Sequence, residues 1–418
     1  MPLGLYISVP FCRSKCSYCN FASDVFSKAA YGTYVARVLE DISNARKTAY
    51  EFGCALPEAT DSIYLGGGTP SILDPSQLMR IFDMVREQFT VAPGAEITVE
   101  CAPGTLTPAL IETLLRCGVN RVSLGVQSFV DEESASVGRL HDRATVLAEI
   151  ERLRAAGLDN INVDIIAGLP HQTAESWEFS LEETIATGAP HVSVYMLEVD
   201  EDSRLGRELI AGGTRYHAHF VPDDDATADF YLRACAALSA AGVAQYEISN
   251  FARAGRESRH NLKYWTRQPY LGFGVDAHSM LPSSHAPLEA FRFSTPDSLD
   301  AYMNRAPHLV TPVPARAALE ESFFLGLRLN RGVDLELLRV EFGPDNMAAS
   351  ESTIEECCRE GLLERQGATV QLTSRGRLLS NEVFARFLGD RSLERRSLEE
   401  RSLKKRSLER RSAGTRSA

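Results

Sequence analysis

The chain has 418 residues, enough for two or three domains with separate hydrophobic cores. Its 44% hydrophobic and 24% charged residues are typical of a globular protein, and it contains no run of about 18 apolar residues that could span a bilayer. The net charge is −12, and because residues 391–418 contribute +6, the body of the chain carries −18, which argues against nucleic-acid binding.

The cysteine content bears on the compartment. Nine cysteines, an odd number, are scattered without the spacing of a disulfide framework, which indicates a reducing environment. The first ten residues also lack the basic start and the small-residue cleavage site of a signal peptide. We therefore expect a cytoplasmic protein.

The first predicted element is a buried strand at Leu3–Pro10, and it leads directly into three cysteines. Cys12, Cys16 and Cys19 have the spacing C-x-x-x-C-x-x-C on a short loop, and Phe21 stands where a fourth cysteine would follow. Three thiolates can bind three irons of a [4Fe–4S] cluster and leave the fourth iron open, whereas an electron-carrying cluster normally takes four cysteines. The alternatives are a structural zinc site, which requires a fourth Cys or His, and three unrelated buried thiols. The spacing favours the cluster.

Strands and helices alternate after this loop. A helix is predicted over Ala29–Tyr50. The next predicted strands are Ser62–Leu65, Glu96–Glu100, Arg121–Gln127, Asn160–Ala167 and His191–Leu197, and the helices between them are Pro75–Phe89, Pro108–Arg116, Arg143–Ala156 and Ala174–Thr187. Six short apolar strands separated by helical periods indicate parallel β/α units. The pattern is compatible with a partly closed barrel and with an open doubly wound sheet, and both bind ligands at the carboxyl ends of their strands.

Glycine and polar residues gather where these strands end. The triplet Gly66–Gly68, followed by Thr69, ends the second strand, and the polar residues Glu100, Gln127 and Asp164 lie at or near the ends of later strands. A glycine triplet lets the backbone approach a ligand, and its N–H groups can bind a carboxylate. The G-K-[ST] ending of a phosphate loop is absent. Taken alone, the triplet is equally compatible with a tight turn.

From about Ala317 the pattern changes to short helices around a hairpin. The predicted helices are Ala318–Leu329, Leu335–Phe342, Ser352–Glu360 and Gly376–Phe387, with a short strand near Val370–Leu372. This order is typical of a winged-helix-like module, a type that often binds DNA. Because the candidate recognition helix, Ser352–Glu360, is acidic, we expect a lid or docking element instead.

Within the last part of the chain, Arg391–Arg411 repeats Arg-Ser-Leu at five-residue intervals. Leucines at this spacing advance about 500° around a helix and form no apolar stripe. We therefore predict a disordered basic tail, with contact to a membrane surface as the alternative.

The cysteine spacing, with Tyr18 inside it and Gly-Gly-Gly-Thr-Pro downstream, resembles the radical S-adenosylmethionine (SAM) superfamily. The resemblance implies a partial (β/α)6 barrel in which the amino and carboxylate groups of SAM chelate the open iron. One electron from the cluster then cleaves SAM to methionine and a 5′-deoxyadenosyl radical.

Within that superfamily, residues 1–385 resemble the oxygen-independent coproporphyrinogen III oxidases and their relatives. The resemblance implies that Tyr6 approaches SAM, that the glycine loop holds its methionyl group, and that Glu100 binds its amino group or ribose. The implied SAM contacts are Tyr6, Gly67, Gly68, Thr69, Glu100, Gln127, Arg139 and Asp164.

Two features separate the branches of this family. The oxidase motif continues to a further cysteine two residues after the third, where this chain has Phe21. The stretch His260-Asn-Leu-Lys-Tyr264-Trp265 resembles the H-N-x-x-Y-W motif of radical SAM heme chaperones. The His260 imidazole could reach heme iron, and the aromatic side chains offer apolar faces to a porphyrin. Without the resemblance, a core histidine beside packed aromatics is the alternative.

We therefore predict a cytosolic protein with a [4Fe–4S] cluster and SAM that binds heme and hands it to acceptor hemoproteins, membrane-associated respiratory enzymes among them. An electron donor for the cluster is a further expected partner, and nucleic acid is not. Two alternatives remain: an oxidase that decarboxylates coproporphyrinogen III, and an iron–sulfur regulatory switch that acts through the winged-helix-like module.

These patterns divide the chain into four parts. We predict a partial barrel with the cluster loop over residues 1–240 and a barrel-closing segment with the H-N-x-x-Y-W motif over 241–316. A winged-helix-like module over 317–390 and a disordered tail over 391–418 complete the division.

Overall fold

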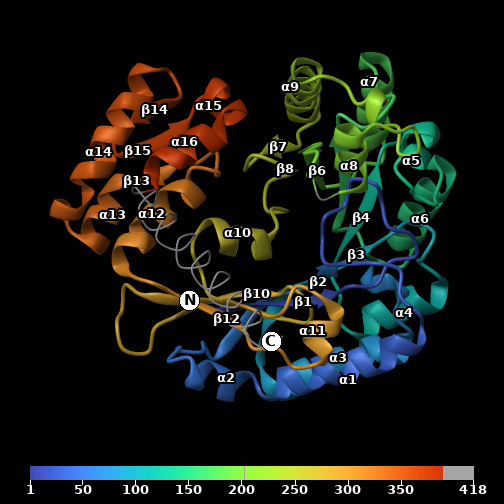
Figure 1. Ribbon diagram of the computed structural model, residues 1–418, viewed down its shortest axis with the longest axis horizontal. Coiled ribbons are helices and arrows are strands. Elements are labelled where there is room, and N and C mark those ends of the chain that lie inside the picture. The colour runs from blue at the N-terminus through green and yellow to red at the C-terminus, as the bar shows by residue number, and fades with distance from the viewer. Residues whose placement is uncertain (202, 389–418) are drawn as a thin grey trace, which may run out of the picture.

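The computed structural model describes residues 1–201 and 203–388, and the predicted disordered tail lies outside this range. Its main element is a twelve-stranded sheet in the order β12-β11-β10-β9-β1-β2-β3-β4-β5-β6-β8-β7 (Figure 1). The strands are β1 (Leu3–Val9), β2 (Ala59–Gly67), β3 (Thr90–Cys101), β4 (Arg121–Gln127), β5 (Ile161–Ala167), β6 (His191–Met196), β7 (Ala244–Gln245), β8 (Asn250–Ala252), β9 (Tyr270–Phe273), β10 (His278–Pro282), β11 (Ala290–Ser294) and β12 (Leu309–Val313).

The order of the strands separates the two folds that the sequence pattern left open. Strands β1 to β6 are parallel and lie side by side in chain order. A doubly wound sheet would reverse its order at a switch point, and no reversal occurs between these six strands. The outer neighbours of β1 and β6 are β9 and β8, so the six strands do not close on each other. The predicted partial (β/α)6 barrel is confirmed.

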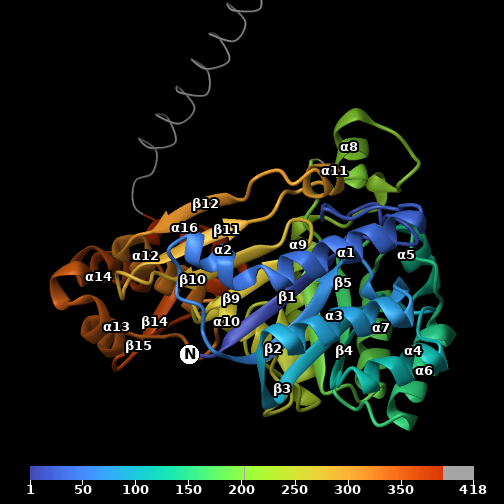
Figure 2. The same ribbon diagram turned by 90° about the horizontal axis from the view of Figure 1, so that it is seen from below.

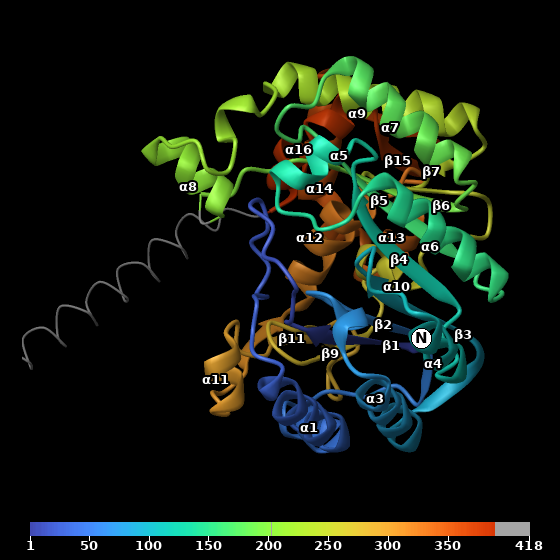
Figure 3. The same ribbon diagram turned by 90° about the vertical axis from the view of Figure 1, so that its right-hand side faces the viewer.

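Helices cover the outer face of this barrel (Figure 3). They are α1 (Ala29–Ser43), α2 (Ala45–Glu51), α3 (Pro75–Gln88), α4 (Pro108–Arg116), α5 (Asp131–Ser136), α6 (Arg143–Ala155), α7 (Ala174–Ala186), α8 (Arg204–Ala211) and α9 (Asp224–Ala240), with short 3-10 turns at Pro70–Ile72 and Ala218–Phe220. The single helix predicted over Ala29–Tyr50 is wrong, because the chain breaks at Asn44. The Asn44 side-chain amide donates to the Glu40 carbonyl (2.9 Å), a local bond that competes with helix continuation. Within the described residues, no helix is both long and apolar enough to cross a membrane.

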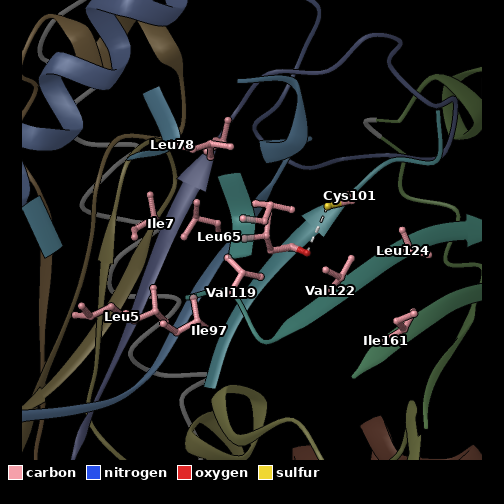
Figure 4. Packing of buried hydrophobic residues seen from close by; sticks show 14 of the residues in the cluster. Leu5, Ile7, Leu65, Leu78, Ile97, Cys101, Val119, Val122, Leu124 and Ile161 are labelled. Atoms are coloured by element: carbon pink, nitrogen blue, oxygen red, sulfur yellow. Dashed lines mark hydrogen bonds between the residues drawn. The ribbon is translucent and has the colours of Figure 1, made fainter. Parts of the chain in front are cut away.

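The core lies between the strands and these helices. Leu3, Leu5, Ile7 and Val9 of β1 are fully buried, and Leu5 and Ile7 point into the layer that contains Leu78 of α3 (Figure 4). Figure 2 shows α1 and α3 lying over this outer face of the first strands. Because side chains alternate along a strand, Gly4, Tyr6 and Ser8 face the barrel interior. The interior is therefore left for polar side chains.

The C-terminal module has the predicted succession of helices around a hairpin, but the last helix, predicted over Gly376–Phe387, is divided at Leu379 into two. Helices α12 (Ala315–Gly326), α13 (Leu335–Phe342) and α14 (Pro344–Arg359) precede the hairpin of β14 (Leu363–Gln366) and β15 (Thr369–Leu372), and β13 (Val333–Asp334), α15 (Ser374–Leu378) and α16 (Ser380–Phe387) complete it. Its core also contains Tyr270 and Met280 of the large sheet. The module is thus packed against the barrel-closing strands, with α10 (Arg259–Trp265) in contact with both α12 and β2 (Figure 1).

One carboxylate joins the module to the large sheet. Glu321 of α12 is 5% exposed and bonds to Arg267 Nε (3.1 Å) and Arg292 Nη1 (2.7 Å). Arg267 follows α10, whereas Arg292 belongs to β11. A shared buried anion between two cations fixes the position of α12 relative to the sheet.

We expect Glu321→Gln to lower the free energy of unfolding by about 2–3 kcal/mol, because it leaves two largely buried guanidinium groups without a counter-charge. Chemical denaturation monitored by circular dichroism measures the change. Glu355→Gln, exposed on α14, is the matched control and should change stability little. Equal stability of the two variants would contradict a structural role for Glu321.

Candidate functional site

The loop that carries the three cysteines is anchored at both ends. The Cys12 N–H donates to the Asp24 carbonyl (3.0 Å), and the Lys15 ammonium donates to the carbonyls of Phe21 (2.7 Å) and Ser23 (2.6 Å). The Ser17 N–H bonds to the Val137 carbonyl (3.1 Å). These contacts close residues 12–24 into a compact loop at the carboxyl end of β1.

The three thiols of this loop lie close enough to interact electrostatically. Burial raises the pKa of the Cys12 thiol, and the neighbouring Cys19 and Cys16 raise it further. Thr69 Oγ1 lies 3.9 Å from the Cys12 sulfur, and Arg139 Nη1 lies 3.7 Å from the Cys16 sulfur. In the described residues no three Cys, His, Asp or Glu side chains are already arranged around one point as ligands. The donor set, three thiols beside an arginine, nevertheless fits an iron–sulfur cluster with one open iron.

The glycine triplet is required by the packing of the strands themselves. A Cβ on Gly68 would lie 2.7 Å from the carbonyl oxygens of Val9 and Phe11, and one on Gly66 would lie 2.9 Å from the Glu100 carboxyl group. Gly67 has φ +102°, a conformation that favours glycine. The triplet therefore lets the end of β2 approach the start of the cysteine loop.

The N–H groups of this turn are already used within the protein. Gly68 donates to the Val9 carbonyl and Thr69 to the Phe11 carbonyl, both at 2.8 Å. The Gly67 N–H donates to Glu100 Oε2 (3.1 Å). The carboxylate that the triplet binds in this structure is thus the side chain of Glu100.

Glu100 and Asp164 place two carboxyl groups in the barrel interior. Glu100 accepts from the Tyr64 hydroxyl (2.9 Å), and burial together with the charge of Asp164 raises its pKa to about 7. Asp164 accepts from Asn162 Nδ2 (2.7 Å) and Ser123 Oγ (3.0 Å), while burial raises its pKa. Two acids with raised pKa values form a site suited to a cationic ligand.

Gln127 and Arg139 meet at the end of β4. The β4–β5 register shifts between Gly125 and Gln127, and Gln127 has φ +71°. A Cβ on Gly125 would lie 3.0 Å from Gln127 Nε2 and 3.1 Å from Arg139 Nη2, whose guanidinium donates to the Gly125 carbonyl. Arg139 therefore joins the strand end to Cys16 of the cluster loop.

His260 lies at the other end of the barrel. It is 1% exposed on α10 beside Gly4 and Ser62, which are paired near the start of β1 and β2. Eight residues separate Gly4 from Cys12, on the order of 25 Å of extended chain. The structure thus brings the cysteines and most of the predicted SAM contacts to one end of the strands, and His260 to the opposite end. Two predicted contacts, Tyr6 and Asp164, lie midway along β1 and β5, and the Tyr6 ring is 6.4 Å from the His260 ring.

Both ring nitrogens of His260 have partners. Nδ1 lies 3.0 Å from Ser62 Oγ and Nε2 lies 2.9 Å from the Tyr264 hydroxyl. Burial and the nearby charges of Lys263 and Arg121 lower its pKa to about 3, so the ring is neutral at ordinary pH. In this arrangement neither nitrogen is free to bind iron.

A cavity of about 390 Å³ connects the two ends. It begins at the cysteine loop and the glycine turn and reaches α10 and the barrel-closing strands. Its lining residues are Tyr6, Ser8, Phe21, Ala22, Gly67, Tyr264, Tyr270, Val275, Asp276 and His278. Four of the ten lining residues are tyrosine or phenylalanine, one is a carboxylate and one an imidazole, and the cavity volume is in the range of small-molecule sites.

The sequence analysis did not single out three parts of this site. The Tyr64 hydroxyl donates to Glu100. Tyr64 pairs with Tyr6 in the β1–β2 register, and the alternation of side chains along the second strand could have indicated that it faces the interior. Glu96 accepts the first N–H groups of α10, from Arg259 and His260, both at 3.1 Å. The Asp276–His278 pair lines the cavity but belongs to no motif in the sequence. The Glu96 contacts join distant parts of the chain and leave no local pattern.

Comparison with known proteins identifies relatives over nearly the whole chain. The radical SAM superfamily matches residues 6–183, and the HemN C-terminal domain matches residues 313–379. The heme chaperone HemW of Bacillus subtilis is 34% identical over 391 residues, 92% of this chain and 99% of that protein. HemW of Escherichia coli is 36% identical over 278 residues, 66% of this chain and 70% of that protein.

Among solved structures, coproporphyrinogen III oxidase (HemN) from Escherichia coli, a radical SAM enzyme, has a similar fold. The TM-score is 0.78 at 22% identity, covering 92% of this chain and 90% of that chain. At this identity the likeness describes the fold alone.

The raised pKa of Glu100 predicts a pH dependence of stability. The folded carboxyl group keeps its proton up to about pH 7, whereas the unfolded one ionises near its ordinary value of 4.5, so raising the pH across this interval favours unfolding. Between pH 5 and pH 8 the free energy of unfolding should fall by about 2–3 kcal/mol more for the wild type than for Glu100→Gln. Denaturant titrations at both pH values measure the difference.

Glu87→Gln, exposed on α3, is the control, and it should follow the wild type at both pH values. If Glu100→Gln also followed the wild type, Glu100 would be ionised in the folded protein and the cationic-ligand site would lose its support.

Proposed function

Since the chain belongs to the HemW family of radical SAM proteins, we propose that it is a heme chaperone, which binds heme and transfers it to acceptor hemoproteins by means of a [4Fe–4S] cluster and SAM. The observation that carries this proposal is the match to HemW of Bacillus subtilis over 92% of the chain. The aromatic cavity between the cysteine loop and α10 supports it, because it offers apolar faces to a porphyrin.

We assign the cluster to the cysteine loop. A [4Fe–4S] cluster with SAM on its open iron supplies one-electron chemistry. Cys12, Cys16 and Cys19 are the proposed ligands, and the Arg139 guanidinium lies 3.7 Å from the Cys16 sulfur. The anchored loop and its contact with Thr69 keep the thiols at the mouth of the barrel.

We assign SAM to the strand ends beside this loop. Glu100 and Asp164 give the interior two acidic groups that can face the positive charges of SAM, and the close-packed glycine turn leaves room beside them. The proposed contacts are Tyr6, Gly67, Gly68, Thr69, Glu100, Gln127, Arg139 and Asp164. Six of them lie at or beyond the carboxyl ends of the strands, which agrees with ligand binding in barrels of this kind, and Tyr6 and Asp164 lie midway along β1 and β5.

We place heme in the cavity, with His260 contributing through Tyr264. The Tyr6, Tyr264 and Tyr270 rings line the cavity, and Phe21 stands at its edge, 66% exposed. His260 lies behind Tyr264 and holds its hydroxyl group. A buried neutral histidine in this position orients an aromatic wall of the cavity.

The coproporphyrinogen oxidase and the regulatory switch have less support as functions of this chain. The likeness to HemN describes the fold, and Phe21 occupies the place of the additional cysteine of the oxidase motif. The winged-helix-like module packs against the large sheet, and its helix α14 has acidic side chains, which suits a lid or docking element better than a DNA reader.

The proposal extends to the partners, the compartment and the domain boundaries. The acceptors would include membrane-associated respiratory enzymes, a separate donor would reduce the cluster, and the protein would act in the cytoplasm without a nucleic-acid partner. We keep the division at residues 240 and 317, since α9 ends at Ala240 and α12 begins at Ala315.

The proposed function can be tested in a heme-transfer assay with anaerobically reconstituted full-length protein. Supplied with SAM, it should bind heme and pass it to an apo-hemoprotein, and it should leave coproporphyrinogen III unchanged. Absorption spectra follow heme, and chromatography follows the porphyrins. Conversion of coproporphyrinogen III to protoporphyrinogen IX would assign the protein to the oxidases.

Cysteine variants serve as controls for this assay. Cys12→Ser, Cys16→Ser and Cys19→Ser each remove one of three ligands and should abolish the cluster, because no spare ligand is available. Cys235→Ser, in α9 away from the loop, should retain it. Unchanged iron content in all of the first three variants would remove the cluster assignment.

His260→Ala should lower heme retention while cluster content stays intact, because α10 lies at the opposite end of the strands from the cysteines. Equilibrium heme titration measures the retention. If His260 acts by holding Tyr264, then Tyr264→Phe, which removes the hydroxyl group but keeps the ring, should reproduce part of the loss. Full heme affinity in His260→Ala would exclude the histidine from the heme site.

A further inference from the structure

The heme site requires an iron ligand that the buried motif histidine does not provide. Heme iron in proteins is commonly held by an imidazole nitrogen. Both nitrogens of His260 are occupied, by Ser62 and Tyr264, and the side chain is 1% exposed. A ligand on the cavity surface must come from another residue.

Within the part of the chain that the structure describes, His278 is the one histidine in the cavity lining. It is the first residue of β10, its side chain is 60% exposed, and the ring contacts Asp276, with Nε2 3.5 Å from Oδ1. Other histidines of the described chain are engaged elsewhere: the rings of His171 and His217 bond to each other at 3.0 Å, and His191 bonds to Asn162 and Tyr246.

Resting on the proposed function, we propose that His278 is the axial ligand of the heme iron and that Asp276 orients its ring. A carboxylate beside one ring nitrogen fixes the imidazole and makes the other nitrogen a better ligand, as is usual for metal-binding histidines. The same cavity wall carries Tyr264 and Tyr270, against which the porphyrin face can pack.

The backbone around this pair is held firmly. The Asp276 N–H donates to the Pro296 carbonyl and the Ala277 N–H to Thr295 Oγ1, both at 2.8 Å, and the Val275 N–H donates to the Tyr34 hydroxyl (3.1 Å). Asp276 has φ +53°, a strained conformation for a residue with a side chain. Strain of this kind clusters at functional sites, and the Asp276 carboxylate lies beside the ring of His278.

The position of His278 also suits a protein that must release heme. An enclosed ligand would retain its heme, whereas an imidazole that is 60% exposed can be reached by an acceptor from outside. The other end of the cavity adjoins Phe21 and Gly67, beside the proposed cluster and SAM site. Heme bound to His278 would therefore lie between the cysteine loop and the barrel-closing strands.

The test uses full-length, anaerobically reconstituted protein titrated with hemin. His278→Ala should raise the dissociation constant for hemin by about tenfold or more. It should also remove the spectrum of imidazole-ligated iron. His285→Ala is the matched control, because His285 is exposed on the neighbouring β10–β11 turn and outside the cavity lining; it should behave as the wild type.

Two further variants make the assignment specific to the ligand. His278→Cys should restore binding with the absorption and electron paramagnetic resonance signature of thiolate-ligated heme, which a merely structural role would not produce. Asp276→Asn should keep the imidazole signature with weaker binding. Iron and SAM contents of all variants should equal those of the wild type, since neither residue is among the proposed cluster or SAM contacts.

The outcomes separate this inference from the proposed function. If the wild type binds no heme, the heme-chaperone assignment itself fails. If the wild type binds heme and His278→Ala keeps both the affinity and the imidazole spectrum, the chaperone assignment stands and His278 is excluded as the ligand. Loss of the imidazole spectrum in His278→Ala, with a thiolate spectrum in His278→Cys, supports the ligand assignment.

Discussion

The candidate site depends on the hydrogen bonds between the glycine turn after β2 and the end of β1. Gly68 and Thr69 donate to the carbonyls of Val9 and Phe11, one residue before Cys12. This contact is possible only because Gly68 has no side chain. The same turn donates the Gly67 N–H to Glu100, so the cysteine loop, the glycine turn and the interior acid form one connected unit. A change in any of them would displace the proposed cluster and SAM sites together.

The division of each strand into two faces explains why the interior can bind a charged ligand. Alternate residues of β1 to β6 fill the apolar layer beneath the helices, which stabilises the barrel by burial of hydrophobic surface. The other face is left for Tyr64, Glu100 and Asp164. Burial raises the pKa of both acids, and the charge of Asp164 raises the pKa of Glu100 further. A bound cation would favour the ionised form of both groups.

The barrel-closing segment differs from the barrel in the part of the site that it forms. It fills the amino ends of the strands with α10, whose first N–H groups bond to Glu96, and it supplies the cavity wall with Tyr264, Tyr270 and His278. Glu321 then ties this segment to the C-terminal module. The proposed heme site is thus held between two rigid parts of the molecule, while His278 remains accessible from outside.

The sequence by itself determined the local features of this protein. The cysteine spacing, the β/α alternation and elements such as α4 and β4 agree with the structure residue for residue, because periodicity, proline at a helix start and glycine after a strand act within a few residues. Only the tertiary structure decided that the strands follow in barrel order, that His260 is enclosed with both nitrogens bonded, and that His278 lies in the same cavity as Tyr6. The pairing of β9 with β1 brings residues about 270 positions apart into one sheet, and burial and cavity shape arise from such long-range contacts, which leave no pattern in the local sequence.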